Sequence, residues 1–294
     1  MRMDADRPRR TLLYLPASNA RAMEKARSLA ADVLLLDLED AVAPDAKTAA
    51  REAAVAAVTG GNAGGFGHRE VGIRVNALGT PWAEADLAAV AASAADFLVV
   101  PKIGDADDAR AAVARAGGKP VLAMIETPGA VLRADAIAGV PGIMGFIAGF
   151  NDLAKDLHAR PGADRLPLLY SASRMLLAAR AAGIPAFDGV FASIADLDGL
   201  AAEAQQGLAL GFDGKTCIHP GQLAVVNRVF TPSAGDVEEA RQMMAAYAEA
   251  MAAGRGVATW KGRLVEALHV QEAERLLRLA ERIAALDSGV RLEI

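Results

Sequence analysis

Several short apolar runs in this chain end in a charged or amide residue. The runs are LLLDLED (34–40), IRVN (73–76), FLVVPK (97–102), VLAMIE (121–126) and IMGFIAGFND (143–152). A short apolar run that stops at a charge is typical of a buried parallel strand, whose side chains pack on both faces. The carboxyl ends of parallel strands meet at one edge of a sheet, so these charged residues should gather there. Such a gathering weakens the fold, and we therefore predict an active site at this edge.

Most of the charged residues at this edge are acidic. The carboxylates are Asp37, Glu39, Asp40, Glu126 and Asp152, and the cations are Arg74 and Lys102. Two carboxylates about 4 Å apart repel by ~4 kcal/mol at an effective dielectric of 20, which a divalent cation would relieve. Because the donors are all oxygens, without a nearby His or Cys, Mg²⁺ is favoured over zinc. Glu126 and Asp152 end neighbouring strands, so we expect them to bind one Mg²⁺ and to leave its other positions to water or a chelating substrate.

Some of these acids also have a structural interpretation. Glu126 could cap the helix that follows it, and Asp152 could likewise be a helix N-cap. Asp40 could pair with Lys47 or Arg51 on the following helix. The sequence leaves these alternatives open.

We expect the charged residues of the first apolar run to form ion pairs with the arginine of the second. If the strand continues through Asp37 and Glu39, the period-two alternation places both on one side. Arg74 lies inside an apolar strand, where a guanidinium is costly unless it meets carboxylates. We therefore assign Asp37 and Arg74 to the site, whereas Lys102 is either a site residue or a salt-bridge partner.

Strand and helix patterns alternate through the first 230 residues. Strands are predicted at 11–15, 33–36, 72–75, 97–100, 121–125, 143–148, 186–190 and 212–215. Helices are predicted at 19–30, with Ser18 as a possible N-cap, and at 45–58, 82–92, 106–116, 129–138, 167–182, 197–210 and 221–230. This alternation predicts an α/β fold, a (β/α)8 TIM barrel. A doubly wound open sheet is the alternative, but the first strand lacks the glycine fingerprint that it would normally carry.

The rest of the chain, residues 231–294, is predicted to be a C-terminal extension to a 1–230 catalytic domain. Helices are expected at 236–253 and 266–286, with a hairpin at 256–265, and the extension is expected to contact a neighbouring subunit. A glycine-rich stretch at 60–68 lacks the lysine of a phosphate loop and is interpreted as a connection.

Composition excludes several functional classes. The net charge of −5 gives no basic surface for nucleic acid, and no apolar run is long enough for a membrane span. The single cysteine, Cys217, excludes an intrachain disulfide framework, and the first ten residues lack a signal-like apolar stretch. We therefore expect a cytoplasmic enzyme.

An ordered set of motifs makes a family resemblance specific. It comprises RRTLLYLPASN, ADVLLLDLEDAVAPDAKTAAR, IRVN, VPK, IET, GFNDL and GFDGKTCIHPGQLAVVN, and it extends over nearly the whole chain. Together these resemble the citrate lyase beta-subunit-like family of the HpcH/HpaI aldolase superfamily, which includes malyl-CoA and citramalyl-CoA lyases.

The resemblance implies a homotrimeric or hexameric barrel enzyme that cleaves or forms a carbon–carbon bond next to a coenzyme A thioester. It implies that Glu126 and Asp152 bind Mg²⁺, that Arg74 contacts the 2-keto acid or its developing oxyanion, and that Asp37 supports the metal-bound waters. Gly149, in the GFND segment, is assigned with Glu126 to substrate binding. In related lyases an arm from a neighbouring subunit supplies an aspartate, and the matching residue here is Glu266. Glu266 would protonate the acetyl-CoA enolate, or act as the base in the reverse condensation.

Three other functions remain as alternatives. The chain could be an aldolase that splits free 2-keto acids without coenzyme A, or an acyl-CoA thioesterase. It could also be a subunit of a citrate lyase complex that acts on a carrier-bound thioester.

Overall fold

A computed structural model describes residues 7–59 and 65–288 of the chain. The described residues divide into two compact units. Residues from Arg9 to Phe230 form the first unit, and those from Thr231 onward, with Arg7 and Pro8, form the second. Of the connection predicted at 60–68, residues 60–64 lie outside the described part. Among the described residues, no helix combines the length and the apolar character needed to cross a membrane.

The first unit is a closed barrel of parallel strands. Each strand pairs with the next in chain order, and β8 closes the ring by pairing with β1. The strands are β1 (Thr11–Pro16), β2 (Val33–Asp37), β3 (Glu70–Arg74), β4 (Phe97–Val100), β5 (Val121–Ile125), β6 (Ile143–Ala148), β7 (Ala186–Asp188) and β8 (Gly214–Cys217). The predicted TIM barrel is confirmed.

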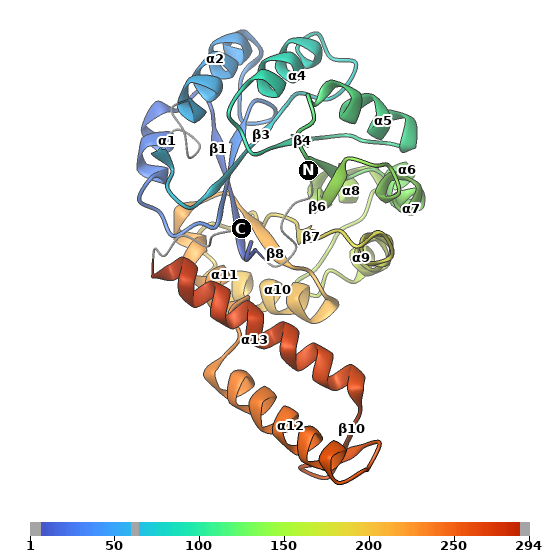
Figure 1. Ribbon diagram of the computed structural model, residues 1–294. Helices are drawn as coiled ribbons and strands as arrows, with labels where there is room; N and C mark the ends of the chain where they lie inside the picture. Colours follow the sequence, from blue (N-terminus) through green and yellow to red (C-terminus); the bar gives the residue numbers. More distant parts are fainter. Residues whose placement is uncertain (1–6, 60–64, 289–294) are drawn as a thin grey trace. The chain divides into compact units, whose positions relative to one another are not determined.

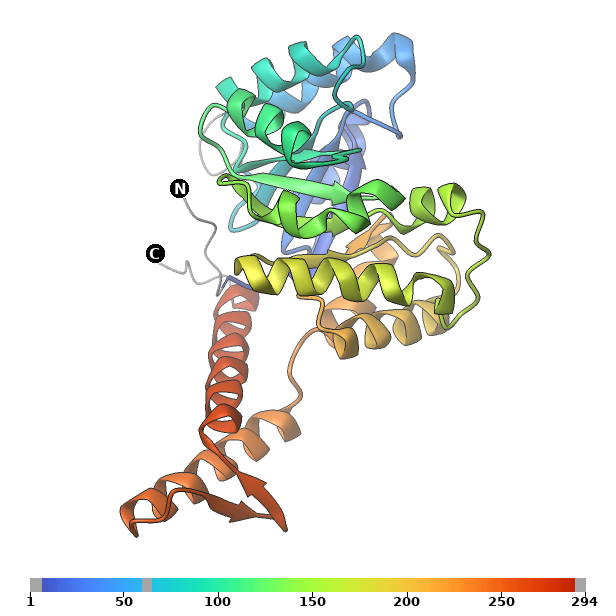
Figure 2. The same cartoon turned by 90° about the vertical axis from the view of Figure 1, so that its right-hand side faces the viewer.

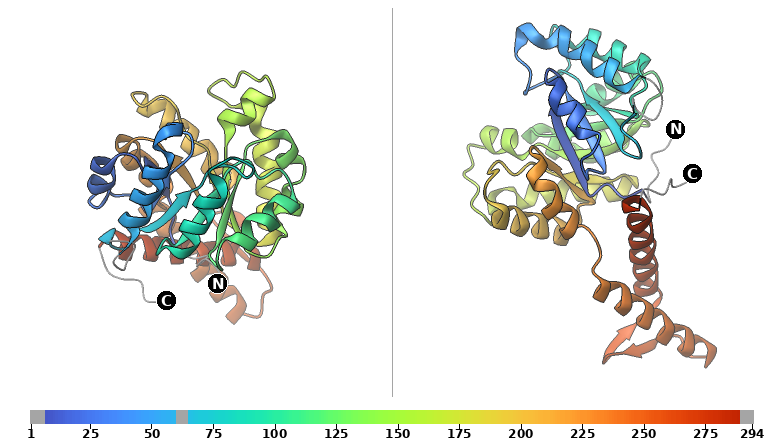
Figure 3. Two further views of the ribbon diagram at one scale, coloured as in Figure 1. Left: turned by 90° about the horizontal axis from the view of Figure 1, so that it is seen from above. Right: turned by 90° about the vertical axis from the view of Figure 1, so that its left-hand side faces the viewer.

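Helices surround the ring of strands in chain order, as three views show (Figures 1 and 3). They are α1 (Ala20–Ala26), η1 (Pro44–Ala46), α2 (Lys47–Val58), α4 (Ala83–Ala92), α5 (Ala106–Arg115), α6 (Pro128–Leu132), α7 (Ala134–Ala138), α8 (Phe150–Asp156), η2 (Leu166–Leu168), α9 (Leu169–Ala182), α10 (Leu197–Leu210), η3 (Pro220–Gln222) and α11 (Leu223–Val229). This is the outer ring of a (β/α)8 fold.

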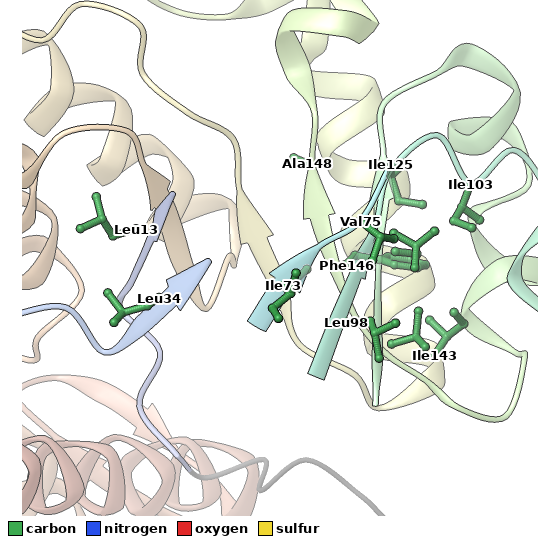
Figure 4. Close-up of a cluster of buried hydrophobic side chains, with 14 of the residues drawn as sticks. Leu13, Leu34, Ile73, Val75, Leu98, Ile103, Ile125, Ile143, Phe146 and Ala148 are labelled. Atoms are coloured by element: carbon green, nitrogen blue, oxygen red, sulfur yellow. The ribbon is translucent and has the colours of Figure 1, made fainter. Parts of the chain in front are cut away.

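The alternation of side chains along each strand creates two apolar layers. Outward-facing residues pack against the helices, and Leu13, Leu34, Ile73, Leu98 and Phe146 are examples (Figure 4). Inward-facing residues fill the barrel, and they include Leu12, Val33, Leu35, Phe97, Val99, Leu122, Met124, Ile147 and Phe187. The interior of the barrel is therefore a packed core, and its chemistry is confined to the ends of the strands.

Gly72 in β3 makes room for an aromatic ring in that interior. A Cβ atom at this position would lie 2.1 Å from Cε2 of Phe97 on the neighbouring strand. Phe97 is 1% exposed and so has no free space into which to retreat. A glycine is required here because the ring occupies the volume of the missing side chain.

The second unit consists of two long helices joined by a short hairpin (Figure 2). The elements are α12 (Ala234–Ala252), β9 (Ala258–Trp260), β10 (Arg263–Val265) and α13 (Ala267–Asp287). Ser233 caps α12, because its hydroxyl accepts the N–H of Asp236 and the Asp236 carboxylate accepts the N–H of Ser233.

Two local predictions were wrong, and one helix was missed. The helix predicted at 129–138 is interrupted at Arg133, which ends α6 and precedes α7. The N-cap of α1 is Asn19 rather than Ser18, since the Asn19 side chain accepts the N–H of Ala22. The short helix α8, which begins directly after β6, was not predicted. Its sequence, FNDLAKD, has too few residues for a helical period to be recognised.

Candidate functional site at the carboxyl end of the barrel

The alternation that points every second side chain into the barrel continues past the apolar core to the carboxyl ends of the strands. In β2, Val33 and Leu35 face inward and Asp37 follows them at the same parity. In β5, Leu122 and Met124 face inward and the next residue of that parity is Glu126. Period-two geometry thus places the predicted acids in the layer above the packed core.

Asp37 and Arg74 form a buried ion pair on neighbouring strands. Nε and Nη2 of Arg74 donate to the two carboxylate oxygens of Asp37 at 2.7 and 2.8 Å. The same carboxylate accepts the backbone N–H groups of Glu39 and Ala41, so both of its oxygens are fully used. These hydrogen bonds help to raise the pKa of Arg74 well above its usual value, although burial acts in the opposite direction. The ring of Tyr14 lies 4.8 Å from the guanidinium carbon and completes the enclosure of Arg74.

Glu39 contacts the same guanidinium, but its surroundings favour a negative charge less than those of Asp37 do. Its Oε2 lies 2.9 Å from Nη1 of Arg74, the nitrogen that Asp40 also approaches at 3.4 Å. Burial raises the pKa of Glu39 to about 8, because the single charge of Arg74 does not outweigh burial and three neighbouring carboxylates. Glu39 is therefore mostly protonated at neutral pH. It faces Arg74 although β2 ends at Asp37 and does not continue through Glu39.

Glu126 and Asp152 converge on one cation, the ammonium group of Lys102. Nζ of Lys102 contacts Oδ2 of Asp152 and lies 3.7 Å from Oε1 of Glu126. The backbone N–H of Lys102 also donates to Oε1 of Glu126 at 2.6 Å. Burial raises the pKa of Glu126, and the charge of Lys102 opposes this increase. The two carboxylates predicted to share an ion thus lie together at the end of the barrel.

Gly149 and α8 bring these two acids together. A Cβ atom at Gly149 would lie 2.3 Å from Cβ of Glu126 and 2.5 Å from its Oε2, so the glycine makes room for the carboxylate. Gly149 is also the N-cap of α8, whose first turn carries Asp152. The segment GFND therefore places Asp152 beside Glu126, and Asp152 itself is not the N-cap. The cap of α6 is Thr127, whose hydroxyl accepts the N–H of Ala130, so capping is not the role of Glu126.

The donor set formed by Glu126 and Asp152 fits a hard divalent cation. The two carboxylates are close enough to contact one ammonium group, and they supply only oxygen ligands. Within residues 7–59 and 65–288, no group of three or more His, Cys, Asp or Glu residues could hold a metal ion. A site with two carboxylates suits Mg²⁺, which usually retains waters or takes oxygens from a substrate.

The residues after DLED have positions different from those predicted. Lys47 does not pair with Asp40, because its ammonium donates to the backbone oxygens of Leu38 and Glu39 at 2.8 and 2.6 Å. Arg51 instead pairs with Asp86 at 3.1 Å. The interpretation of Asp40 as a partner of Lys47 or Arg51 was therefore wrong. Lys47 fixes the loop that carries the site acids.

Glu266 lies in the second unit, directly before α13. Its side chain is exposed, and its backbone N–H donates to Nδ1 of His269 at 3.1 Å. The structure brings Asp37, Arg74, Glu126, Gly149 and Asp152 together within the first unit. A catalytic role for Glu266 stays a prediction.

The assignment of the site residues overlooked a buried ionic network behind β7 and β8. Lys215 and Asp188 are fully buried, and they meet at 3.1 Å. Lys215 also contacts Glu203 of α10 at 2.7 Å, and Arg165 binds both oxygens of Asp188 at 2.8 and 3.0 Å. A lysine inside a predicted strand segment was the available sequence signal. Cys217 next to this network is fully buried, and burial raises the pKa of its thiol to about 12, so the thiol is unreactive.

Two family descriptions match this chain. The HpcH/HpaI aldolase/citrate lyase family matches residues 10–220, and a carbon–carbon bond lyase family of the TIM-barrel fold matches residues 173–283. Both agree with the closed barrel described above.

Curated relatives and a solved structure extend the similarity to nearly the whole chain. The chain is 45% identical over 278 residues to a (3S)-malyl-CoA thioesterase of Cereibacter sphaeroides, covering 95% of this chain and 96% of the relative. It is 35% identical to an L-malyl-CoA/beta-methylmalyl-CoA lyase of the same organism, with 95% and 96% covered. The CitE protein of Mycobacterium tuberculosis, solved with magnesium, acetoacetate and coenzyme A, superposes with a TM-score of 0.80 at 33% identity, covering 94% of this chain and 99% of that protein.

Proposed function

The chain belongs to the HpcH/HpaI aldolase/citrate lyase family, and on that premise we propose that it is a Mg²⁺-dependent carbon–carbon lyase of a malyl-CoA-type thioester. The substrate is a 3-hydroxyacyl-CoA whose hydroxyl carbon also carries a carboxylate. Cleavage yields a 2-keto acid and acetyl-CoA, and the same site allows the reverse condensation.

One observation carries this proposal. The buried carboxylate of Glu126 and the carboxylate of Asp152 converge on a single positive charge at the end of the barrel. The solved relative with magnesium and coenzyme A supports the identity of the metal and the thioester class. A divalent cation held by Glu126 and Asp152 supplies Lewis-acid polarisation of the hydroxyl and carboxylate oxygens of the substrate.

The residues of the chain supply positioning and charge around that oxygen. Arg74, rigidly held by Asp37, donates to the oxygen that becomes the carbonyl of the keto acid, where negative charge develops. Burial of Arg74 beneath Tyr14 strengthens this interaction, since water does not screen it. The proton of the hydroxyl group leaves as the carbon–carbon bond breaks, and the acetyl carbon takes up a proton to give acetyl-CoA.

We assign that last proton transfer to Glu266 of a neighbouring copy of the chain. The residue is exposed in the second unit, and the apolar side chains of Leu264 and Leu268 that flank it are 56% and 61% exposed. Such exposed apolar groups beside an acid suit an arm that is covered in an oligomer. The proposed assembly is a homotrimer or hexamer in which the unit from Thr231 onward contacts the next subunit.

A second candidate is hydrolysis of the same thioester. The specific observation in its favour is the 45% identity to a (3S)-malyl-CoA thioesterase over 95% of the chain. In that reaction a water attacks the thioester carbonyl, the carbon–sulfur bond breaks, and the products are malate and free coenzyme A. The metal pair and Arg74 would then orient the hydroxy acid part of the substrate without breaking its carbon chain.

Product analysis with the purified full chain, Mg²⁺ and malyl-CoA tests both candidates. A lyase releases a 2-keto acid and no free thiol, whereas a thioesterase releases free thiol and no keto acid. Citramalyl-CoA and free hydroxy acids without coenzyme A serve as alternative substrates. Turnover that is unaffected by EDTA, or undiminished in Glu126→Ala, would refute the metal site. A rate within a few-fold of wild type in Glu266→Ala would remove Glu266 from the mechanism.

A further inference from the structure

Lys102 adopts a backbone conformation that a lysine rarely takes. Its φ is +56°, in the left-handed region that favours glycine. The residue follows the last residues of β4, and its backbone N–H donates to Oε1 of Glu126 at 2.6 Å. This hydrogen bond holds the turn in the left-handed conformation and keeps Lys102 beside Glu126.

The side chain of Lys102 reaches both candidate metal ligands. Its ammonium contacts Oδ2 of Asp152 and lies 3.7 Å from the same Oε1 of Glu126 that accepts its backbone N–H. Glu126 is 2% exposed and has no access to bulk water that could screen its charge. The lysine side chain, in contrast, is 39% exposed, so its head can turn to solvent without the backbone moving.

We propose that Lys102 is a built-in competitor of the divalent cation at Glu126 and Asp152. This inference rests on the proposed metal site. The ammonium neutralises the two acids when no metal is bound, and it must withdraw before both carboxylates can ligate the ion. The backbone bond to Glu126 persists during the exchange, so Lys102 remains anchored beside the site.

This competition couples metal binding to substrate binding. After the exchange, the divalent cation and the displaced ammonium are two positive charges in one small region, opposed by two carboxylates already engaged. A 2-keto acid adds a carboxylate to that region and so offsets the ammonium as well as ligating the metal. Magnesium alone should therefore bind weakly, and Mg²⁺ and the keto acid should strengthen each other's binding by the same factor.

Calorimetric titration of the full chain with MgCl₂ at constant ionic strength tests the competition. The variants are Lys102→Met, which removes the charge at similar size, and Lys102→Arg, which keeps it. Lys155→Met is the matched control, because it removes the same charge from an exposed residue of α8 that lies three positions after Asp152. We expect Lys102→Met to bind Mg²⁺ about tenfold more tightly than wild type, and Lys102→Arg and Lys155→Met to stay within about threefold of it.

Repeating the titration with saturating pyruvate, a simple 2-keto acid, tests the coupling. Pyruvate should tighten Mg²⁺ binding in wild type more than in Lys102→Met. Thermal melting adds a second measurement: Lys102→Met should melt lower than wild type in EDTA and gain more from Mg²⁺. Lys102→Gln provides a second neutral variant for both experiments.

The outcomes separate this inference from the proposed function. If wild type binds Mg²⁺ and neither neutral variant binds it more tightly, Lys102 is an ordinary salt-bridge partner and the inference is wrong while the metal site stands. An equal increase in Mg²⁺ affinity in Lys155→Met would also overturn it, because the loss of any nearby positive charge would then explain the effect. If no variant binds Mg²⁺ with or without pyruvate, the metal site fails and the inference fails with it.

Discussion

Asp37 and Arg74 lie directly opposite each other in the register of β2 and β3, and the guanidinium of Arg74 binds both carboxylate oxygens of Asp37. Each strand therefore ends in one partner of the same buried pair. The arrangement fixes the charge of Arg74 at the end of the barrel without a flexible loop. It also makes the orientation of Arg74 dependent on a single neighbouring carboxylate.

Removal of the Asp37 carboxylate should be strongly destabilising. Asp37→Ala leaves Arg74 buried with only Glu39 and Asp40 nearby, and loss of one partner of a buried pair costs about 3–5 kcal/mol. Urea unfolding should show this loss, with a smaller one in Asp37→Asn, which keeps the shape of the side chain. Glu24→Ala breaks an exposed ion pair with Arg27 and should cost less than about 0.5 kcal/mol. Equal stability of Asp37→Ala and Glu24→Ala would contradict the role of the pair.

Neutralisation of the buried metal ligand should stop catalysis while the barrel remains intact. Glu126→Gln keeps the size of the side chain but removes the charge that holds a divalent cation. A loss of several kcal/mol of transition-state stabilisation corresponds to a decrease in kcat/KM of about a hundredfold or more. Asp156→Asn, an exposed change at the end of α8, is the control and should stay within about twofold of wild type. Steady-state rates with malyl-CoA and Mg²⁺ provide the measurement, and full activity of Glu126→Gln would remove it from the site.

Glu39 should make the stability of the metal-free protein fall as the pH rises. Its pKa is about 8 in the folded protein, compared with an ordinary value of 4.5, so between these values the folded state binds more protons than the unfolded state. The stabilisation is complete below about pH 4.5 and is lost as the pH rises towards 8, by no more than about 5 kcal/mol. Glu39→Gln cannot ionise and should lack this part of the decrease.

Unfolding of both proteins in EDTA at several pH values between 5 and 8.5 tests this. The difference in unfolding free energy between Glu39→Gln and wild type should shift in favour of the variant as the pH increases. A difference that does not change with pH would show that Glu39 is already ionised in the folded protein at pH 5.

The barrel could be predicted from the sequence because each strand is a short apolar run with a defined end. Strand prediction was most accurate at β4, β5 and β6, where an apolar run meets a proline, a charge or a glycine. The proximity of Asp37, Arg74 and Glu126 followed from the same rule, because parallel strands bring their carboxyl ends together. Asp152 was expected at the end of β6, but it lies in the first turn of α8. Glu39 contacts Arg74 as well, but β2 ends before it, so the strand alternation that the sequence suggested does not extend to Glu39.

The remaining features depend on contacts between distant segments, which local patterns do not record. The left-handed backbone of Lys102 arises from a hydrogen bond to Glu126, which is 24 residues away. The ion pair of Lys215 with Asp188 connects two strands and is covered by α10, so neither residue has a local signal for its partner. The helix α8 is too short for periodicity, and its position depends on packing against residues that come later in the chain.

Arg165 is the residue that should fix α8, and with it Asp152. Its guanidinium binds Asp188 and the side chain of Gln206, and its carbon Cζ lies 5.7 Å from the ring centre of Phe150, the first residue of α8. In Arg165→Met, Asp188 keeps Lys215 as a partner. We therefore expect the free energy of unfolding to fall by about 2–3 kcal/mol, which is at or below the lower limit for breaking a buried ion pair.

The position of α8 is tested by metal affinity rather than by stability alone. If Arg165 holds α8 in place, Arg165→Met should weaken Mg²⁺ binding by about tenfold, as is typical when a residue that orients a metal ligand is removed. Arg165→Lys should restore less than half of this effect, since one ammonium group cannot replace three guanidinium nitrogens that donate separately to Asp188, to Gln206 and to the backbone oxygen of Glu203. Arg160→Met, an exposed change between α8 and η2, is the control. If Arg165→Met lowers the unfolding free energy but binds Mg²⁺ as tightly as wild type, the network supports β7 and β8 and leaves Asp152 to be positioned by Gly149 and the first turn of α8.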